Sequence, residues 1–282
     1  EIITRWEDFG KPEPERGARF SFAPPVRSST SRVYLKIQDG CDNFCSYCIV
    51  PSVRGRLISF PSKQILDYIR TLAGGGIREI TLLGQNVNSY AYEKIRFPGL
   101  LQAMNEMEGL YRIRFTTSHP KDLSPELIQC FGRLEKLCAH IHLPFQAGSN
   151  RVLKAMKRGY TAEKYMDLIG ELRAARPGIA LTSDVMVGFP GETDEDFERT
   201  LDLIRKVEFD NLFSFKYSDR VGTPAAKMED KIPETRKLAR LERLQELQRK
   251  ITLKKNKELL GRRLEVLVEG ASKKGTGFTG RT

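Results

Sequence analysis

The chain has 282 residues, of which 40% are apolar and 29% are charged, and its formal net charge is +11. This length can bury a substantial core in one large domain or two small ones, and the composition is that of a soluble globular protein. No stretch approaches the roughly 18 uninterrupted apolar residues of a membrane span, and residues 1–17 lack the features of a secretory signal. We therefore expect a cytoplasmic protein without a membrane contact.

Residues 1–30 are rich in Pro, Gly, Ser and charge, and they show no sustained periodicity. This composition is typical of a linker. Since a linker connects two folded parts, we expect a further domain before it.

Short apolar or β-branched runs alternate with amphipathic stretches from Arg32 onward, which is the pattern of βαβ units and a parallel sheet. The predicted strands are residues 33–37, 79–83, 113–116, 139–143, 179–187 and 212–217. The predicted helices follow Pro61 and Ser124, lie near 100–107, occur twice within 150–173, and span 194–207. Six such units fall short of the eight of a closed barrel. We expect an α/β fold, an open partial (β/α)6 barrel, with ligands at the strands' C-terminal ends.

A long charged helix is predicted over residues 233–260. Leucines at 238, 241, 244 and 247 and an isoleucine at 251 form an apolar stripe that should pack on the barrel.

Residues 261–282 read as the start of a small β module. The segment 225–282 holds 16 Lys or Arg against 8 Asp or Glu. This basic excess suits either a solvated helix face or a surface that meets phosphates.

Three cysteines, Cys41, Cys45 and Cys48, form a C-x3-C-x2-C motif directly after the first predicted strand. In a reducing compartment such a cluster indicates a metal or redox site rather than disulfides. Three thiolates on one loop can bind three irons of a 4Fe-4S cubane and leave the fourth iron open, where S-adenosylmethionine (SAM) can bind and be reductively cleaved. The alternatives are a structural zinc site, for which no fourth Cys or His follows at a suitable spacing, and buried unpaired thiols.

The remaining cysteines and the histidines indicate packing rather than chemistry. Cys130 lies on a predicted helix and Cys138 precedes a strand, so both should contribute to the core. His119, His140 and His142 are explained by packing and hydrogen bonds, and we assign no metal to them.

Six ordered segments of the chain resemble the radical SAM methylthiotransferases, closest to the branch that acts on tRNA. They are GCDNFCSYCIVPSVRG from residue 40, TLLGQNVNSY at 81–90, RFTTSHP at 114–120, HIHLPFQAGSNRVLKAMKRGYT at 140–161, SDVMVGFPGET at 183–193, and FSFKYSDRVGTPAA at 213–226. The chain departs from the family pattern at Leu57, Phe60 and Ala147, which puts the loop after the cysteines in doubt but not the reaction class.

The resemblance implies how the chain is organised. It implies a linker at 1–30, a radical SAM core at 31–232, the C-terminal helix of that core at 233–260, and the start of a TRAM-like RNA-binding domain at 261–282. An N-terminal domain with a second 4Fe-4S cluster is expected in the family.

The activity implied is addition of a methylthio group to C2 of N6-isopentenyladenosine beside the anticodon. Partners implied are tRNA, an electron donor such as flavodoxin or ferredoxin, and a sulfur source, with the enzyme a monomer. Two enzymatic alternatives stay open: a methylthiotransferase acting on an aspartate of a ribosomal protein, or one acting on threonylcarbamoyladenosine. A non-enzymatic alternative is an RNA-binding protein with a structural metal.

The resemblance and the positions at strand ends together predict the cofactor contacts. Cys41, Cys45 and Cys48 bind the cluster, and Tyr47 lies over the adenine. The predicted SAM contacts are Gln85, Ser118, Gln146, Arg158, Asp184 and Gly188. For each there is a plainer role, such as a helix cap, a solvated arginine or a turn glycine. Tyr217 and Arg220 are predicted to meet the target nucleotide.

Overall fold

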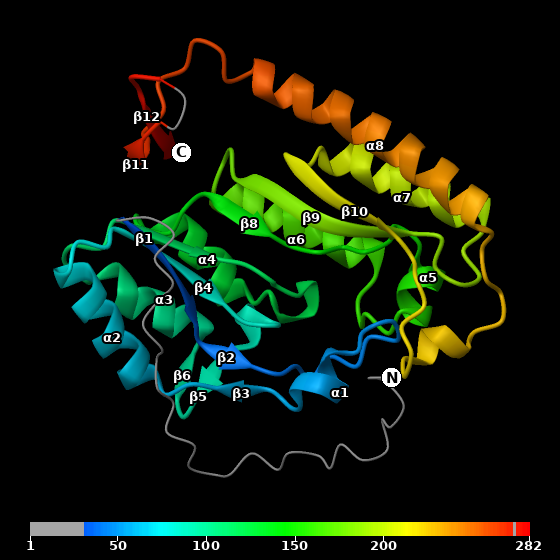
Figure 1. Ribbon diagram of the computed structural model, residues 1–282, viewed down its shortest axis with the longest axis horizontal. Coiled ribbons are helices and arrows are strands. Elements are labelled where there is room, and N and C mark those ends of the chain that lie inside the picture. Colours follow the sequence, from blue (N-terminus) through cyan, green and yellow to red (C-terminus); the bar gives the residue numbers. More distant parts are fainter. Residues whose placement is uncertain (1–30, 273–274) are drawn as a thin grey trace.

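Six parallel strands form the centre of the computed structural model, which describes residues 31–272 and 275–282. The linker expected at residues 1–30 lies outside the described residues. The strands are β1 Arg32–Lys36, β4 Glu79–Leu83, β7 Arg112–Phe115, β8 His140–His142, β9 Ala180–Val187 and β10 Asn211–Lys216. They form two sheets with the orders β1-β4-β7 and β8-β9-β10, which a parallel bridge between Ile113 and Leu137 joins. The expected open, partial (β/α)6 barrel is thereby confirmed (Figure 1).

Eight helices, counted over the described ranges, alternate with these strands. They are α1 Val50–Arg54, α2 Ser62–Gly74, α3 Phe97–Asn105, α4 Pro125–Arg133, α5 Asn150–Ala155, α6 Ala162–Ala175, α7 Asp194–Val207 and α8 Glu234–Lys257. Side-chain caps explain several of their starts: Ser124 accepts from the backbone N–H of Leu127, and Thr161 accepts from that of Lys164. None of these helices combines the length and apolar character needed to cross a bilayer.

Several short elements escaped prediction because they carry too few residues to show a period. The two-residue strands are β2 Gln38–Asp39, β3 Ile58–Ser59, β5 Ala91–Tyr92 and β6 Ile95–Arg96, which pair as β2-β3 and β5-β6. Three 3-10 helices span Val87–Ser89, Pro120–Asp122 and Pro224–Lys227. All these pieces lie in the connections between the main strands and helices.

Strand β9 shows how the barrel divides its two faces. Its residues alternate strictly between buried and half-buried. Leu181, Val185 and Val187 belong to the buried core. Thr182 and Asp184 occupy the alternate positions on the other face, where Phe213 of β10 contacts the ring of His142. The apolar face belongs to the core, whereas the opposite face of the strand carries the polar side chains.

The buried face of α8 contains most of the predicted apolar positions, together with two polar ones that the pattern did not mark. Leu244 and Ile251 are buried as expected, but Leu238 is 46% exposed, and the other buried positions are Arg240 and Gln248. Gln248 donates to the carbonyl of Phe209 over 2.8 Å. Leu241 and Leu247 pack half-buried against the core, so the predicted stripe faces the barrel except at Leu238. The apolar pattern missed only the two buried polar side chains, which find partners on other elements. Helix α8 lies alongside α7 and β10 (Figure 1).

The C-terminal hairpin is formed by β11 Leu267–Ala271 and β12 Phe278–Arg281, within the segment that was predicted to start a small β module. It lies at the end of the barrel where the strands start. Arg112 at the start of β7 donates to the carbonyl of Arg281 and pairs with Glu265 at 3.0 Å. This hairpin is therefore at the opposite end of the barrel from the cysteine loop (Figure 1).

Replacing Gly148 by Ala should destabilise the fold by about 2 kcal/mol, because the new Cβ would overpack a closed contact. That Cβ would lie 2.4 Å from the Arg199 carbonyl oxygen and 2.6 Å from the Thr200 Cα, both backbone atoms of α7. Gly170→Ala is the matched control: nothing lies within 4 Å of a Cβ there, in the interior of α6. Urea unfolding should show a gain of about 0.5–1 kcal/mol for the control. Equal effects at both positions would contradict the packing.

Candidate active site

The cysteine loop follows β2 at the C-terminal end of the barrel. Gly40 opens it with φ +70°, and a Cβ there would lie 2.1 Å from the carbonyl oxygen of Arg56, so the position requires glycine. Cys41 donates its backbone N–H to the carbonyl of Gly55. Cys41 and Cys45 are buried, while Cys48 is half-buried. The predicted trio therefore lies on one folded loop rather than on an extended surface segment.

A serine within the motif holds this loop in place. Ser46 is fully buried, its N–H donates to the carbonyl of Met156 over 3.1 Å, and its Oγ donates to the carbonyl of Ala155 over 2.8 Å. Its own carbonyl accepts from the N–H of Ala225 over 2.8 Å. The loop is thus bound both to the end of α5 and to the 3-10 helix at Pro224–Lys227. Sequence reasoning missed Ser46, since its partners lie more than 100 residues away.

The donor set around the loop suits an iron-sulfur cluster. Burial raises the pKa of the Cys41 and Cys48 thiols. Bound metal ions favour the thiolate form of such groups. Over the described ranges, no three His, Cys, Asp or Glu side chains lie close enough together to hold a single ion. A cubane takes one thiolate per iron, so its ligands need not converge on one ion.

Arg158 reaches the cysteine loop from the segment after α5. It is 5% exposed, and its Nη1 lies 3.5 Å from the Cys45 Sγ. Nη2 donates to the carbonyl of Pro144 over 3.1 Å, and Nε donates to the Tyr160 hydroxyl over 3.1 Å. A fixed, buried guanidinium beside the thiols can donate hydrogen bonds to the carboxylate of a ligand. A solvated arginine, the plainer role for this residue, does not fit its burial.

Two predicted contacts, Gln85 and Ser118, follow β4 and β7 and carry buried oxygens without partners. Neither the Gln85 Oε1 nor the Ser118 Oγ has a hydrogen-bond partner among the described residues. Two segments that follow strands have strained backbone: Thr117, next to Ser118, has φ +60°, and Gln146, after β8, has φ +66°. Unsatisfied buried oxygens and left-handed non-glycine residues concentrate at ligand sites. These features mark the C-terminal edge of the barrel as the candidate site.

Asp184 lies on the polar face of β9, at a half-buried position. Its side chain is 31% exposed, and its Oδ1 lies 3.4 Å from the Nε2 of His142. The Nδ1 of His142 contacts the Thr182 hydroxyl, which also contacts His140. Burial therefore does not oblige Asp184 to find a ligand, and its role in binding SAM stays a prediction.

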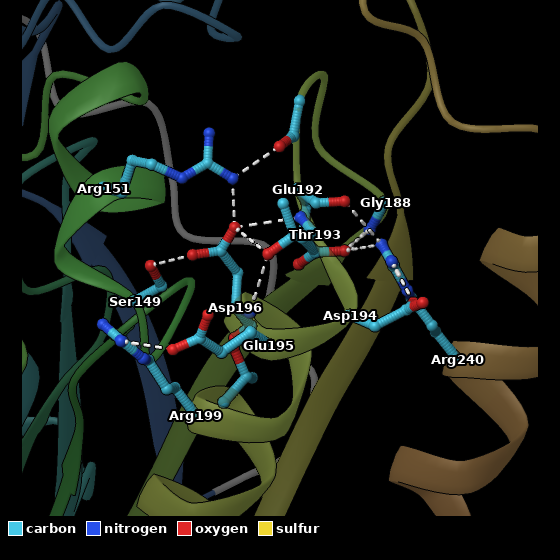
Figure 2. Close-up of polar contacts among 12 residues, drawn as sticks. Ser149, Arg151, Gly188, Glu192, Thr193, Asp194, Glu195, Asp196, Arg199 and Arg240 are labelled. Carbon is cyan, nitrogen blue, oxygen red and sulfur yellow. Dashed lines mark hydrogen bonds and ion pairs between the residues drawn. The ribbon is translucent and has the colours of Figure 1, made fainter.

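The turn after β9 is held by a network of charged side chains (Figure 2). Glu192 is 2% exposed, and its Oε2 accepts from the N–H of Gly188 over 2.6 Å and from Arg240 Nη1 over 2.6 Å. Arg240 of α8, itself 3% exposed, also donates to Asp194. Burial raises the pKa of Glu192 to about 7, although both donors favour the carboxylate.

A second set of contacts fixes the start of α7 beside that turn. Thr193 caps the helix, and its N–H donates to the Asp196 carboxylate in return. Asp196 also accepts from Ser149 and Arg151, and Arg151 donates to the Gly191 carbonyl. Burial opposes ionisation of Asp196, but these hydrogen bonds outweigh it and hold the pKa well below its usual range. Neither Glu192 nor Arg240 was foreseen, since their pairing joins segments 48 residues apart.

Two aromatic residues pack on this turn. Phe189 is fully buried, and its ring centroid lies 6.5 Å from that of Tyr47 and 5.4 Å from that of Tyr217, both in edge contacts. Tyr217 is 3% exposed and donates to Asp219, so it cannot stack on a nucleotide as predicted. The contact with Tyr47 joins the turn after β9 to the cysteine loop.

Two of the six segments that resemble the family, 81–90 and 114–120, contact each other. Asn88 donates to the carbonyl of His119 over 3.0 Å and accepts from its N–H over 2.8 Å. The His119 ring makes an edge contact with that of Tyr160, and its Nδ1 accepts from the N–H of Lys121. As expected, the three histidines are accounted for by packing and hydrogen bonds.

The two cysteines outside the loop differ in burial. Cys130 lies in the core, but Cys138 is half-buried.

Comparison with known proteins matches residues 35–204 to the Radical SAM superfamily. A protein of Moorella thermoacetica named tRNA-2-methylthio-N(6)-dimethylallyladenosine synthase is 53% identical over 253 residues, which are 89% of this chain and 57% of that protein. A protein of Geobacter metallireducens with the same name is 53% identical over 88% of this chain and 57% of its own length. The chain thus spans little more than half of these relatives.

Solved structures show a similar fold at low sequence identity. The radical S-adenosylmethionine methyltransferase TsrM from Kitasatospora setae, with tryptophan and a SAM analogue bound, superposes with a TM-score of 0.58 at 20% identity over 70% of this chain and 38% of its own. Coproporphyrinogen III oxidase from Escherichia coli gives 0.56 at 18% identity, covering 78% of this chain and 52% of its own.

His119 should make the stability of the fold depend on pH. Burial, with Arg158 and Lys121 nearby, lowers its pKa to about 2, so the ring stays neutral in the folded chain. The unfolded chain binds a proton below about pH 6.5, so this residue costs stability as the pH falls below that value. Between pH 7.5 and 5.5 the cost is about 1.4 kcal/mol.

The substitution His119→Asn keeps a hydrogen-bond acceptor and removes the titrating group. Urea unfolding at pH 7.5 and 5.5 should show that this variant loses about 1.4 kcal/mol less than the unaltered chain between the two pH values. The same loss in both proteins would contradict a neutral, buried His119.

Proposed function

Because the chain belongs to the Radical SAM superfamily, whose profile matches it over residues 35–204, we propose that it is the catalytic core of a tRNA methylthiotransferase. The enzyme would add a methylthio group to C2 of N6-isopentenyladenosine next to the anticodon. One observation carries this proposal: the Cys41, Cys45 and Cys48 loop folds against buried Arg158 at the edge where the strands end. The 53% identity to synthases named for this nucleoside supports the choice of substrate.

Cys41, Cys45 and Cys48 would hold a 4Fe-4S cluster through one thiolate each. A cluster held there would supply the electron for reductive cleavage of SAM, and with it the 5'-deoxyadenosyl radical needed to abstract hydrogen from the adenine. The chain's part is to keep the three thiols on a loop that Ser46 fixes to α5. It also excludes water, since two of the thiols and Arg158 are buried.

The residues around the loop would bind and orient SAM. Arg158 can pair with its carboxylate, and the unpartnered oxygens of Gln85 and Ser118 can accept hydrogen bonds from its amino or hydroxyl groups. Gln146, in the segment after β8, has a left-handed backbone conformation, and we propose that it also contacts SAM. For Tyr47, Asp184 and Gly188, already predicted to contact SAM, we propose contacts with the adenosine part.

Partners are proposed from chemistry and charge. The exposed basic side chains of α8 and the residues after it suit the phosphates of tRNA. Several of them pair with neighbouring acids, for example Arg243 with Glu198 and Lys254 with Glu208. Exposed pairs of this kind are weak and can be exchanged for phosphate contacts. We also propose an electron donor such as flavodoxin or ferredoxin, a sulfur source, a monomeric state and a cytoplasmic location.

Replacing Cys41, Cys45 or Cys48 by Ala should abolish both iron binding and reductive cleavage of SAM, because each thiolate holds one iron. After anaerobic reconstitution the unaltered chain should carry about four irons and four sulfides. Cys130→Ala and Cys138→Ala are matched controls that remove thiols elsewhere and should keep the full content. Cleavage of SAM by any of the three loop variants at the unaltered rate would contradict the assignment.

The substrate is tested on the full-length enzyme. Isopentenylated tRNA, the same tRNA without the isopentenyl group, threonylcarbamoylated tRNA and the small-subunit ribosomal protein are each incubated with SAM and reductant. Mass spectrometry of the products should find the methylthio group on the isopentenylated nucleoside only. Modification of the protein or of threonylcarbamoyladenosine instead would reverse the choice of substrate.

A further inference from the structure

The ion pair between Glu192 and Arg240 joins the C-terminal helix to the turn after β9 (Figure 2). The Glu192 side chain is 0% exposed and that of Arg240 is 3% exposed. Removing such a pair from water is expensive, and replacing a buried pair by apolar residues often leaves stability unchanged or improves it. The Glu192 Oε1 and the Arg240 Nε also lack hydrogen-bond partners among the described residues. Stability alone therefore gives little reason for this pair.

The geometry gives the pair a different role. The same Glu192 oxygen accepts from both Arg240 and the N–H of Gly188, and Arg240 also donates to the Glu192 carbonyl and to Asp194. One guanidinium therefore makes several hydrogen bonds to the end of the turn. Its planar arrangement of N–H groups allows this, whereas the single ammonium group of a lysine does not. The turn cannot rotate without breaking buried hydrogen bonds to α8.

A neighbouring residue of α8 closes the other side of the turn. Lys237 lies one helical turn before Arg240, and its Cγ would be 2.4 Å from a Cβ placed on Gly188. Its Nζ donates to the carbonyl of Tyr217 at the end of β10. Gly188, with φ +72°, is thus packed beneath α8 while its N–H is bonded to Glu192. The glycine is required by these internal contacts, whatever else it binds.

The turn also packs against the cysteine loop. Phe189 directly follows Gly188, and its buried ring contacts the ring of Tyr47, which stands between Cys45 and Cys48. A continuous set of contacts therefore runs from Arg240 through Glu192 and Phe189 to the loop. Displacement at the helix would reach the groups proposed to surround the adenosine of SAM.

We propose that Arg240 is a positioning residue for SAM: through Glu192 it holds the Gly188–Gly191 turn, and with it Phe189 and Tyr47, in the arrangement that binds the cofactor. This inference rests on the proposed function. It makes the C-terminal helix part of the cofactor site although the helix lies on the outside of the barrel.

Arg243 provides a matched control on the same helix. Like Arg240 it lies over the Phe197 ring, at 5.3 Å against 5.6 Å, and it pairs with an acidic side chain of α7, Glu198. Its pair with Glu198 is 57% and 46% exposed, however, and among the described residues its side chain has no hydrogen bond to the turn. Arg240→Lys and Arg243→Lys keep the charge and remove the fork in each case.

Two measurements on the reconstituted chain test how each substitution changes SAM binding and the mobility of the turn. The Kd for SAM, from equilibrium dialysis under anaerobic conditions, should rise about tenfold or more in Arg240→Lys and stay within about twofold in Arg243→Lys. Amide hydrogen exchange without SAM should be faster at residues 188–193 in Arg240→Lys only, because the Gly188 N–H loses its fixed acceptor.

A further variant guards against misfolding. Glu192→Gln with Arg240→Met removes both charges, so no unpaired charge is left buried. It should reproduce the weaker SAM binding with a melting temperature close to that of the unaltered chain.

SAM binding by this double variant and by Arg240→Lys within about twofold of the unaltered chain would overturn the inference and leave the proposed function standing. If the unaltered, reconstituted chain itself failed to bind SAM, the proposed function would fall and this inference with it.

Discussion

The position of the cysteine loop depends on one buried residue, Ser46. Its N–H and hydroxyl bind the carbonyls at the end of α5, and its carbonyl accepts from the 3-10 helix after β10. No water can replace these bonds at a fully buried site, so releasing the loop would strand polar groups at a cost of about 1–3 kcal/mol each. Because Ser46 lies between Cys45 and Cys48, fixing Ser46 also fixes the backbone that carries these two thiols.

The rest of the site is arranged around that fixed loop. Each strand delivers its contribution where it ends: Gln85, Ser118, Gln146 and the turn at Gly188 share one edge of the sheet with the cysteines. Parallel strands make this unavoidable, since their C-terminal ends all meet at the same edge. The opposite end carries the C-terminal hairpin, bound to Arg112. Chemistry and this hairpin are thus separated by the length of the barrel.

Much of the fold was predictable because it follows from local periodicity. Each of the six main strands was placed with ends within one residue of the observed ends, and α7 was predicted without error. The loop cysteines were recognisable by their spacing alone. What failed depended on partners distant in the chain: the buried Arg240 and Gln248 of α8 look like surface residues until Glu192 and Phe209 are brought to them. Tyr217 was misassigned for the same reason, since the residues around it in the sequence do not show that its ring packs against Phe189.

The central claim is that three thiolates hold a cubane and leave one iron for SAM. Electron-nuclear double resonance on the reduced, reconstituted chain tests it most directly, with SAM labelled by 15N in its amino group or 17O in its carboxylate. The account predicts, for each label, a hyperfine coupling of the size that direct binding to iron produces. SAM that binds the chain without any such coupling would contradict it.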